Sequence, residues 1–234
     1  MKLSIVVPCY NEEKNIPLIL ERFNAVINRD DIEVVLVNNG STDRTAAVLE
    51  EILHKYKFAR TIHVEINQGY GYGILQGLKV TRGEYIGWTH ADMQTDPNDV
   101  IKALCIIEKK GCPQNIFVKG DRKNRPFFDQ LFTTGMSMFE SIYLRRRLID
   151  INAQPNLFHR TFFSTWINPP HDFSLDLYAL YLARSNNLSI ERFDVIFPER
   201  INGVSSWNKG FASKWKFIKR TINFSVKLKR KGIN

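Results

Sequence analysis

The sequence predicts an α/β fold built around a mostly parallel sheet, and three observations support that prediction. Short apolar runs rich in β-branched residues alternate with helical patterns over the first half of the 234-residue chain. Polar turn residues follow each run and lead into the next helical pattern, which is the order expected of strand–helix–strand units with right-handed crossovers. The chain is also 44% hydrophobic and 12% aromatic, enough for one sizeable domain with its own core.

The predicted strands and helices follow one another in a regular order. Apolar runs of strand length occupy residues 3–7, 34–37, 61–66, 85–88 and 115–119. Apolar residues at helical spacing lie between and after them, over residues 16–23, 46–52, 75–80, 99–109 and 131–148. In the last third, 156–163 and 190–197 are expected to be strands on either side of a helix over 172–184. We expect one domain, residues 1–206, followed by a basic tail, residues 207–234.

Polar loops follow the first three predicted strands, at the edge of the sheet where α/β proteins bind their ligands. In the first loop, Tyr10 offers a ring for base stacking, and Glu12 can accept from a ribose hydroxyl or a base. In the second loop, the Asn39 amide can accept from a pyrimidine N3–H and donate to its carbonyl oxygen. Either loop can instead be a turn that caps the next helix. The third loop, 67–73, has three glycines without the GxGxxG spacing, which argues against a dinucleotide-dependent dehydrogenase.

The segment after the fourth predicted strand carries three side chains able to bind a metal ion. In an extended chain, successive side chains point to opposite sides of the backbone, so His90, Asp92 and Gln94 lie on the same side. One imidazole with two oxygen ligands suits Mn²⁺ or Mg²⁺ held jointly with substrate phosphates. The alternative is a polar loop in which Asp96 caps the helix that Pro97 begins.

Three motifs together resemble glycosyltransferase family 2: Pro8-x-Tyr10-Asn11-Glu12, the Asn-Asn-Gly-Ser-Thr-Asp turn at 38–43, and Ala91-Asp92-Met93-Gln94-x-Asp96-Pro97. The nearest subgroup is the polyprenyl-phosphate glycosyltransferases, typified by dolichol-phosphate mannose synthase. The resemblance is dense over residues 3–130 and extends more thinly to about 206. It implies a GT-A-type three-layer sandwich around a mostly parallel sheet, a nucleotide-sugar donor, a divalent metal cofactor, and inversion of the anomeric centre.

The resemblance also implies roles for individual residues. Contacts with the nucleotide sugar are implied for Pro8, Tyr10, Glu12, Asn39, Asn67, Ala91 and Asp92. The family's Asp-x-Asp-x-Gln metal motif corresponds to His90, Asp92 and Gln94, so an imidazole stands in place of the first acid. With one negative charge fewer, we expect weaker metal binding or a preference for Mn²⁺ over Mg²⁺.

Phosphate contacts and the choice of base are implied in the same way. The family's Gly-Ser-Arg motif corresponds to a segment ending at Arg122, and its Arg-x-x-Gly-x-Ser motif runs from Arg200 to Ser205. Asn38 and Asn39 replace a pair of Asp residues, which removes a carboxylate suited to the two donors of guanine. We therefore expect a pyrimidine nucleotide, with a UDP-sugar as the first candidate.

The acceptor decides whether a catalytic base is needed. A lipid phosphate is already anionic and needs none, whereas a sugar hydroxyl needs a carboxylate within hydrogen-bond reach. Asp172 is expected at a helix start, where family members with hydroxyl acceptors place their base, although it can equally be an N-cap. Asp176, one turn later, is expected to face the same way. Transfer to a polyprenyl phosphate is the favoured function; elongation of a cell-surface polysaccharide or lipid-linked glycan and non-catalytic nucleotide binding are the alternatives.

The net charge of +9 is concentrated in the tail. Nine of the 33 basic residues and none of the 24 acidic ones lie between 209 and 234, so the rest of the chain is neutral. Apolar residues recur at helical spacing along the tail, at Phe211, Trp215, Ile218, Ile222 and Val226. A basic amphipathic helix of this kind favours an anionic membrane surface over nucleic acid. It could also pack on the body with its basic face in solvent.

The apolar runs, the first residues and the cysteines indicate where in the cell the protein is expected to act. No apolar run is long enough to cross a bilayer, and the first residues lack the features of a cleavable leader. The cysteines, Cys9, Cys105 and Cys112, have no metal-binding spacing, and an odd number of them suits a reducing compartment. We therefore expect a peripheral protein on the cytoplasmic face of a membrane.

Overall fold

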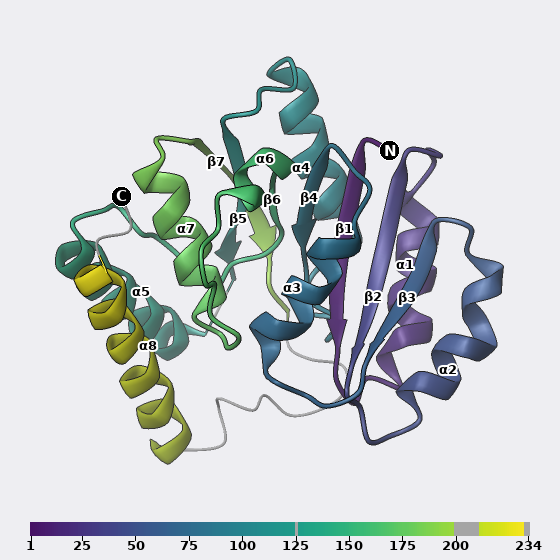
Figure 1. Ribbon diagram of the computed structural model, residues 1–234, viewed down its shortest axis with the longest axis horizontal. Helices are drawn as coiled ribbons and strands as arrows, with labels where there is room; N and C mark the ends of the chain where they lie inside the picture. The colour runs from purple at the N-terminus through teal and green to yellow at the C-terminus, as the bar shows by residue number, and fades with distance from the viewer. Residues whose placement is uncertain (125, 199–210, 232–234) are drawn as a thin grey trace.

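A seven-stranded sheet forms the centre of the protein, in a computed structural model that describes residues 1–124, 126–198 and 211–231 (Figure 1). The strand order is β3-β2-β1-β4-β6-β5-β7, and helices cover both faces of the sheet. The predicted α/β class and the three-layer sandwich around a mostly parallel sheet are therefore confirmed.

The order of elements follows the predicted alternation closely. The strands are β1 (Leu3–Cys9), β2 (Ile32–Asn39), β3 (Ala59–Val64), β4 (Tyr85–Trp88), β5 (Ile116–Lys123), β6 (Asn156–His159) and β7 (Ser189–Ile196). The helices are α1 (Asn15–Val26), α2 (Thr45–Ile52), the 3₁₀ turn η1 (Leu53–Lys55), α3 (Tyr70–Val80), α4 (Pro97–Lys109), α5 (Phe127–Leu144), α6 (Arg160–Ser164), α7 (Leu175–Ser185) and α8 (Phe211–Lys231). Most ends differ from the prediction by only a few residues.

The direction of the strands brings the polar loops together. β1 pairs in parallel with β2 and β4, and β2 pairs in parallel with β3. The carboxyl ends of β1 to β4 therefore meet at one edge of the sheet. β6 runs antiparallel to β4 and β5, so it begins at that same edge. Its first residue, Asn156, lies opposite Trp88 of β4 and opposite Lys119 of β5.

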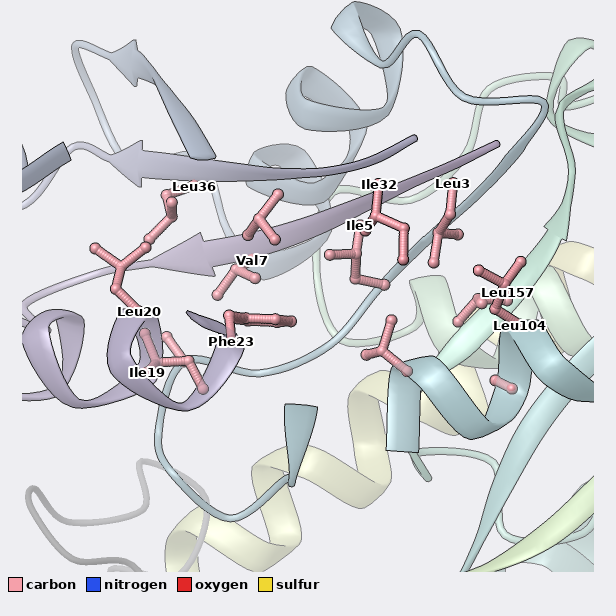
Figure 2. Close-up of a cluster of buried hydrophobic side chains, with 14 of the residues drawn as sticks. Leu3, Ile5, Val7, Ile19, Leu20, Phe23, Ile32, Leu36, Leu104 and Leu157 are labelled. Carbon is pink, nitrogen blue, oxygen red and sulfur yellow. The ribbon is translucent and has the colours of Figure 1, made fainter. Parts of the chain in front are cut away.

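Each face of the sheet has its own hydrophobic core. On one face, Leu3, Ile5 and Val7 of β1 pack with buried residues of α1, α2 and α4 (Figure 2). On the other face, Val6 and Trp88 pack with residues of α3, α6 and α7. Burying each such aliphatic side chain stabilises the fold by roughly 1.5–3 kcal/mol. The two cores hold the carboxyl edge of the sheet rigidly in place.

Three predicted boundaries are wrong, each for a local reason. The predicted strand over 156–163 ends at His159, because the His159 side chain accepts a hydrogen bond from the Thr161 N–H and caps α6. The helix predicted over 131–148 ends at Leu144, because Arg145 adopts a left-handed conformation with φ of 54°. The helix predicted from 172 begins only at Leu175, because residues 172–174 form a turn in which Asp172 Oδ1 accepts from the Ser174 N–H.

The tail helix α8 lies against the body of the protein, beside α5 and α7 (Figure 1). Leu228 is buried in the core that α7 helps to form. The buried Ser225 hydroxyl donates a hydrogen bond to Glu140 of α5, and the Phe224 ring lies 6.4 Å from that of Tyr178. Within the described residues, no helix combines the length and the apolar character needed to cross a bilayer.

Candidate functional site

Hydrogen bonds join the loop after β1 to the loop after β2. The Asn11 N–H donates to Ser41 Oγ over 3.1 Å, and the Thr42 N–H donates to Asn11 Oδ1 over 2.8 Å. The Glu13 N–H donates to Asp43 Oδ2 over 3.2 Å. Asn11 itself has φ of 57°, a conformation that Asn tolerates better than most residues. The two predicted nucleotide loops therefore form one rigid unit.

Within this unit, the predicted contact residues have different surroundings. Tyr10 is 46% exposed, so its ring is accessible for stacking, and Pro8 is half-buried. Glu12 Oε2 accepts a hydrogen bond from Asn15 Nδ2 over 2.6 Å, and the Glu12 N–H donates to Thr45 Oγ1 over 2.9 Å. Glu12 thus takes part in the turn before α1, but it is not the cap of that helix: the N-cap is Lys14, with no side-chain cap hydrogen bond.

The two asparagines at the end of β2 are both buried but have different partners. Asn38 Oδ1 accepts from the Ser41 N–H over 3.2 Å, which is a turn-forming contact. Asn39 Nδ2 donates to the Gly69 carbonyl over 3.0 Å. Asn39 Oδ1 has no hydrogen-bond partner among the described residues, although it is buried. A buried acceptor of this kind costs stability unless a ligand donor meets it.

The glycines after β3 allow a close backbone contact that the sequence did not reveal. A Cβ on Gly69 would lie 2.4 Å from the His171 carbonyl oxygen, and one on Gly71 would lie 2.6 Å from that of Pro170. The Tyr72 N–H donates to the same His171 oxygen over 2.9 Å. The start of α3 is therefore packed against residues 170–172. Asn67, predicted to contact the donor, is exposed in the same loop.

The loop after β4 bends, so the expectation of an extended chain is wrong. Met93 has φ of 64°, and the Gln94 N–H donates to Asp92 Oδ1 over 3.2 Å, which closes a tight turn. Asp92 is buried with Ala91, whereas His90 and Gln94 are half-buried. Gln94 Nε2 donates to the Pro198 carbonyl over 3.0 Å, which brings the segment after β7 to this loop.

The same loop offers donor atoms for a divalent ion. No three His, Cys, Asp or Glu side chains converge on one point in the described part of the chain. The available donor set is one carboxylate, one amide oxygen and one imidazole, from Asp92, Gln94 and His90. Such a set fits an ion that takes its remaining ligands from a diphosphate and water, as Mg²⁺ and Mn²⁺ do in nucleotide sites. Asp96 caps α4, accepting from the Asn98 N–H over 2.9 Å.

A buried polar network lies directly beneath this loop. Asp176 Oδ1 accepts hydrogen bonds from Trp88 Nε1 over 3.1 Å and from Gln154 Nε2 over 2.9 Å. Lys119 Nζ donates to Asn156 Oδ1 over 2.7 Å. Burial raises the pKa of Asp176 and lowers that of Lys119 to about 7. Sequence reasoning missed Lys119 and Asn156, because only the antiparallel pairing of β6 brings them together.

Asp172 and Asp176 were expected to face the same way, but they do not: Asp176 is buried, and Asp172 is only half-buried. Asp172 lies two residues before Ser174, the N-cap of α7, and its Oδ1 accepts from the Ser174 N–H over 2.8 Å, which closes a turn ahead of the helix. Its Oδ2 lies 3.6 Å from Arg220 Nε of α8. The adjacent Phe173 ring stacks on the ring of Tyr70, with 4.6 Å between centroids. Asp172 thus lies at the junction between the tail helix and the loop after β3.

The predicted phosphate contacts are described only in part. Arg122 forms an ion pair with Asp150, in which Arg122 Nε lies 2.9 Å from Asp150 Oδ1. The backbone N–H of Arg122 also donates to Asp150 Oδ2 over 2.9 Å. Burial alone would raise the pKa of Asp150, but the Arg122 guanidinium holds it below its usual value. Arg122 also lies over the Phe197 ring, at 5.2 Å. Arg200 and Ser205 lie outside the described residues.

The family follows from a match over most of the chain. Residues 4–168 match the family described as Glycosyl transferase family 2, and this span includes all four polar loops at the sheet edge. The chain belongs to glycosyltransferase family 2. The resemblance carried by the three loop motifs is therefore confirmed.

Three relatives of this family 2 chain are named for transfer to polyprenyl phosphates. Dolichol-phosphate mannosyltransferase of Pyrococcus furiosus is 30% identical over 62% of this chain and 42% of its own length. Dodecaprenyl-phosphate galacturonate synthase of Rhizobium johnstonii is 29% identical over 64% and 44%. Undecaprenyl-phosphate 4-deoxy-4-formamido-L-arabinose transferase of Pseudomonas fluorescens is 34% identical over 46% and 32%. The chain thus spans less than half the length of these curated relatives.

Solved structures confirm the GT-A fold of this family 2 chain. Glucosyl-3-phosphoglycerate synthase from Mycobacterium tuberculosis, in complex with UDP, superposes with a TM-score of 0.72 over 97% of this chain and 79% of that one. The same enzyme with Mn²⁺, UDP and glucosyl-3-phosphoglycerate gives 0.70 over 96% and 78%. The sequence identity is 16% in both cases, so the likeness establishes the fold alone.

Proposed function

We propose that this protein is an inverting, metal-dependent glycosyltransferase that moves a sugar from a nucleotide sugar to a polyprenyl phosphate at a membrane surface. One observation carries the proposal: the carboxylate of Asp92 and the unpaired amide oxygen of Asn39 are both held, buried, at the carboxyl edge of the same parallel sheet. Rigid loops surround both groups. Membership of the family and the names of the relatives support the reaction and the class of acceptor.

The donor is proposed to be a pyrimidine nucleotide sugar, with a UDP-sugar as the first candidate. Asn39 Oδ1 is a buried acceptor that the N3–H of a uracil ring would satisfy, and the exposed Tyr10 ring would stack on that base. Pro8, Glu12, Asn67 and Ala91 would complete the donor contacts. The solved neighbour crystallised with UDP supports this choice.

A divalent ion is proposed to be held by Asp92 and Gln94, with His90 as a third ligand. When bound, Mn²⁺ or Mg²⁺ would act as a Lewis acid on the leaving diphosphate. The turn closed by Asp92 and the Gln94 N–H fixes the relative position of the two ligands. Arg200 would further neutralise phosphate oxygens through bidentate contacts, and Ser205 would donate a hydrogen bond to them. Arg122 would add positive charge from beside its ion pair with Asp150.

The acceptor phosphate needs no general base, because it is already anionic. In this reading Asp172 positions the junction with α8 through Arg220, and Asp176 positions Trp88 and Gln154 beneath the donor loops. If the acceptor is a sugar hydroxyl instead, Asp172 is the half-buried carboxylate at the site that could act as the base. Asp176 is the weaker candidate, since its Oδ1 already accepts hydrogen bonds from the Trp88 and Gln154 side chains.

A lipid acceptor implies that the protein works at a membrane. We propose a peripheral position on the cytoplasmic face, where sugar nucleotides are available. The basic helix α8 supports contact with an anionic leaflet, because each basic residue near such a surface contributes about 1 kcal/mol.

The proposal is tested with purified protein, a panel of nucleotide sugars, and either a detergent-dispersed polyprenyl phosphate or an oligosaccharide as acceptor, with and without Mn²⁺. We expect metal-dependent formation of a polyprenyl-phosphate sugar. Transfer only to the oligosaccharide, lost in Asp172→Ala, would instead identify a glycan-elongating enzyme. Donor binding without transfer or hydrolysis under any condition would indicate a non-catalytic nucleotide-binding protein.

A further inference from the structure

Helix α5 carries an exposed apolar stripe on the side opposite its contacts with the core. The stripe consists of four large side chains at helical spacing: Leu131 (59% exposed), Met138 (65%), Phe139 (40%) and Ile142 (70%). The opposite side of the helix is buried through Glu140 and Leu144. A cluster of this kind on one helix is unusual for a surface in contact with water and marks an interaction surface.

The stripe is bordered by basic residues at its carboxyl-terminal end. Arg145, Arg146 and Arg147 follow α5 and are exposed. Glu140 is the single acid between 130 and 149, and it is fully buried against Ser225 of α8. The stripe therefore ends in a group of three positive charges.

Helix α8 adds further positive charge at the same end of α5. Lys229 Nζ lies 4.2 Å from the centroid of the Tyr143 ring, and that ring stacks on Phe139 of the stripe, with 5.8 Å between centroids. Lys227 and Arg230 of α8 are exposed. Of the apolar residues that the tail was expected to present, Trp215 is 60% exposed, whereas Ile218, Ile222 and Val226 are only half-exposed, because α8 packs on the body. The side chain of Phe211 lies outside the described part of the structure. The tail alone therefore offers charge more than apolar area.

We propose that the stripe on α5, flanked by Arg145–147 and by the basic face of α8, docks on an anionic lipid bilayer. The apolar side chains would enter the boundary between headgroups and acyl chains, and the cations would lie at headgroup level. A second copy of the chain is the less suitable occupant, because a two-fold interface would bring like-charged arginine groups together.

The docking role of this surface rests on the proposed function, since the surface would hold the enzyme where its lipid acceptor lies. The α5–α8 pair is connected to the candidate site by the ion pair between Arg220 and Asp172. Docking through these helices would therefore orient the carboxyl edge of the sheet relative to the membrane. The inference concerns the docking surface itself and is tested without any sugar donor.

The test is co-sedimentation of the full chain with phosphatidylcholine vesicles, with and without phosphatidylglycerol. We expect binding to the anionic vesicles, and a loss on the order of tenfold or more in the double variant Met138→Asp/Ile142→Asp. Leu18→Asp is the matched control: Leu18 is 40% exposed on α1, which lies at the other end of the sheet from α5 and α8 (Figure 1). It should bind as the wild type does.

A second variant tests the charges separately. Arg145→Gln/Arg146→Gln/Arg147→Gln should lose the preference for phosphatidylglycerol while its thermal unfolding stays unchanged. Three results would overturn the inference: wild-type protein that remains in the supernatant, a double variant that binds like wild type, or a wild-type dimer that the double variant converts to a monomer. Because the vesicles contain no polyprenyl phosphate, failure of sugar transfer and failure of docking are distinguished.

Discussion

Arg220 of α8 forms an ion pair with Asp172, with 3.6 Å between Nε and Oδ2, and so joins the tail helix to the candidate site. The same guanidinium lies 5.2 Å from the centroid of the Phe173 ring. Phe173 stacks on Tyr70, whose ring centroid is 5.8 Å from that of His90. Continuous side-chain contacts thus run from α8 to the loop that holds the candidate metal ligands.

Replacing Arg220 should therefore affect both stability and transfer. We expect Arg220→Gln to lower the free energy of unfolding by about 1 kcal/mol, because it removes a partly exposed ion pair and a cation–π contact. Sugar transfer should fall with it, since residues 172–173 lose their anchor. Urea unfolding and a transfer assay measure the two effects. Asn223→Gln, at an exposed and uncharged position of the same helix, is the control; equal losses in both variants would contradict the anchoring role.

Asp92 should be essential for metal-dependent donor binding. A nucleotide sugar at about 100 times its Kd raises the free energy of unfolding by roughly 2.7 kcal/mol. We expect this stabilisation in the presence of Mn²⁺ for the wild type and its loss in Asp92→Asn, because the only carboxylate of the proposed ligand set is removed. Thermal unfolding with a panel of donors measures it. Asp96→Asn should behave as the wild type, since Asn is an equally good N-cap for α4.

The close contact at Gly71 should not tolerate a side chain. A Cβ there would lie 2.6 Å from the Pro170 oxygen and 2.7 Å from the Asp172 oxygen, both of them backbone atoms. We expect Gly71→Ala to lower the free energy of unfolding by about 1–3 kcal/mol and to displace residues 170–172. Gly135→Ala is the matched helical control, because nothing lies within 4 Å of its Cβ. It should be neutral or stabilise by roughly 0.5–1 kcal/mol, and a similar loss in both variants would refute the packing argument.

Lys119 should make stability depend on pH above neutrality. Its pKa in the folded protein is about 7, against 10.5 when exposed, because burial disfavours the charge. Between these values the unfolded chain binds more protons, so the contribution of Lys119 to stability rises with pH, by about 1 kcal/mol per pH unit.

Urea unfolding at pH 7.5 and pH 9 (~1.5 pH units apart) should show this rise in the wild type and not in Lys119→Met. Lys123→Met, at the exposed end of the same strand, should retain the rise. A wild type and a Lys119→Met protein with identical pH dependence would show that Lys119 stays charged in the fold.

Much of the architecture could be predicted because it rests on short-range patterns. Apolar runs of strand length alternate with helical spacing, and polar residues follow each strand. Parallel pairing then places Asn39 and Asp92 at one edge, as expected. The bend at Met93 could not be predicted, since its φ of 64° depends on the hydrogen bond between the Gln94 N–H and Asp92.

Partners distant in sequence were the part of the site that sequence reasoning missed. Arg122 was expected to face phosphate from its motif alone, and its pairing with Asp150 appears only in the fold. Lys119 gave no local signal, and the burial of Asp176, which was expected to lie beside Asp172, appears only in the fold, because strands and helices from separate parts of the chain enclose both residues.

Periodicity and loop motifs in the chain were sufficient to predict a mostly parallel α/β sheet, the edge at which its polar loops gather and the family, because each depends on neighbours within a few residues. Burial, charge pairing and the exposed side of α5 were decided by the folded protein alone. These properties arise from packing between segments far apart along the chain, where one antiparallel strand and one docked helix determine which polar groups are enclosed and which apolar groups meet solvent.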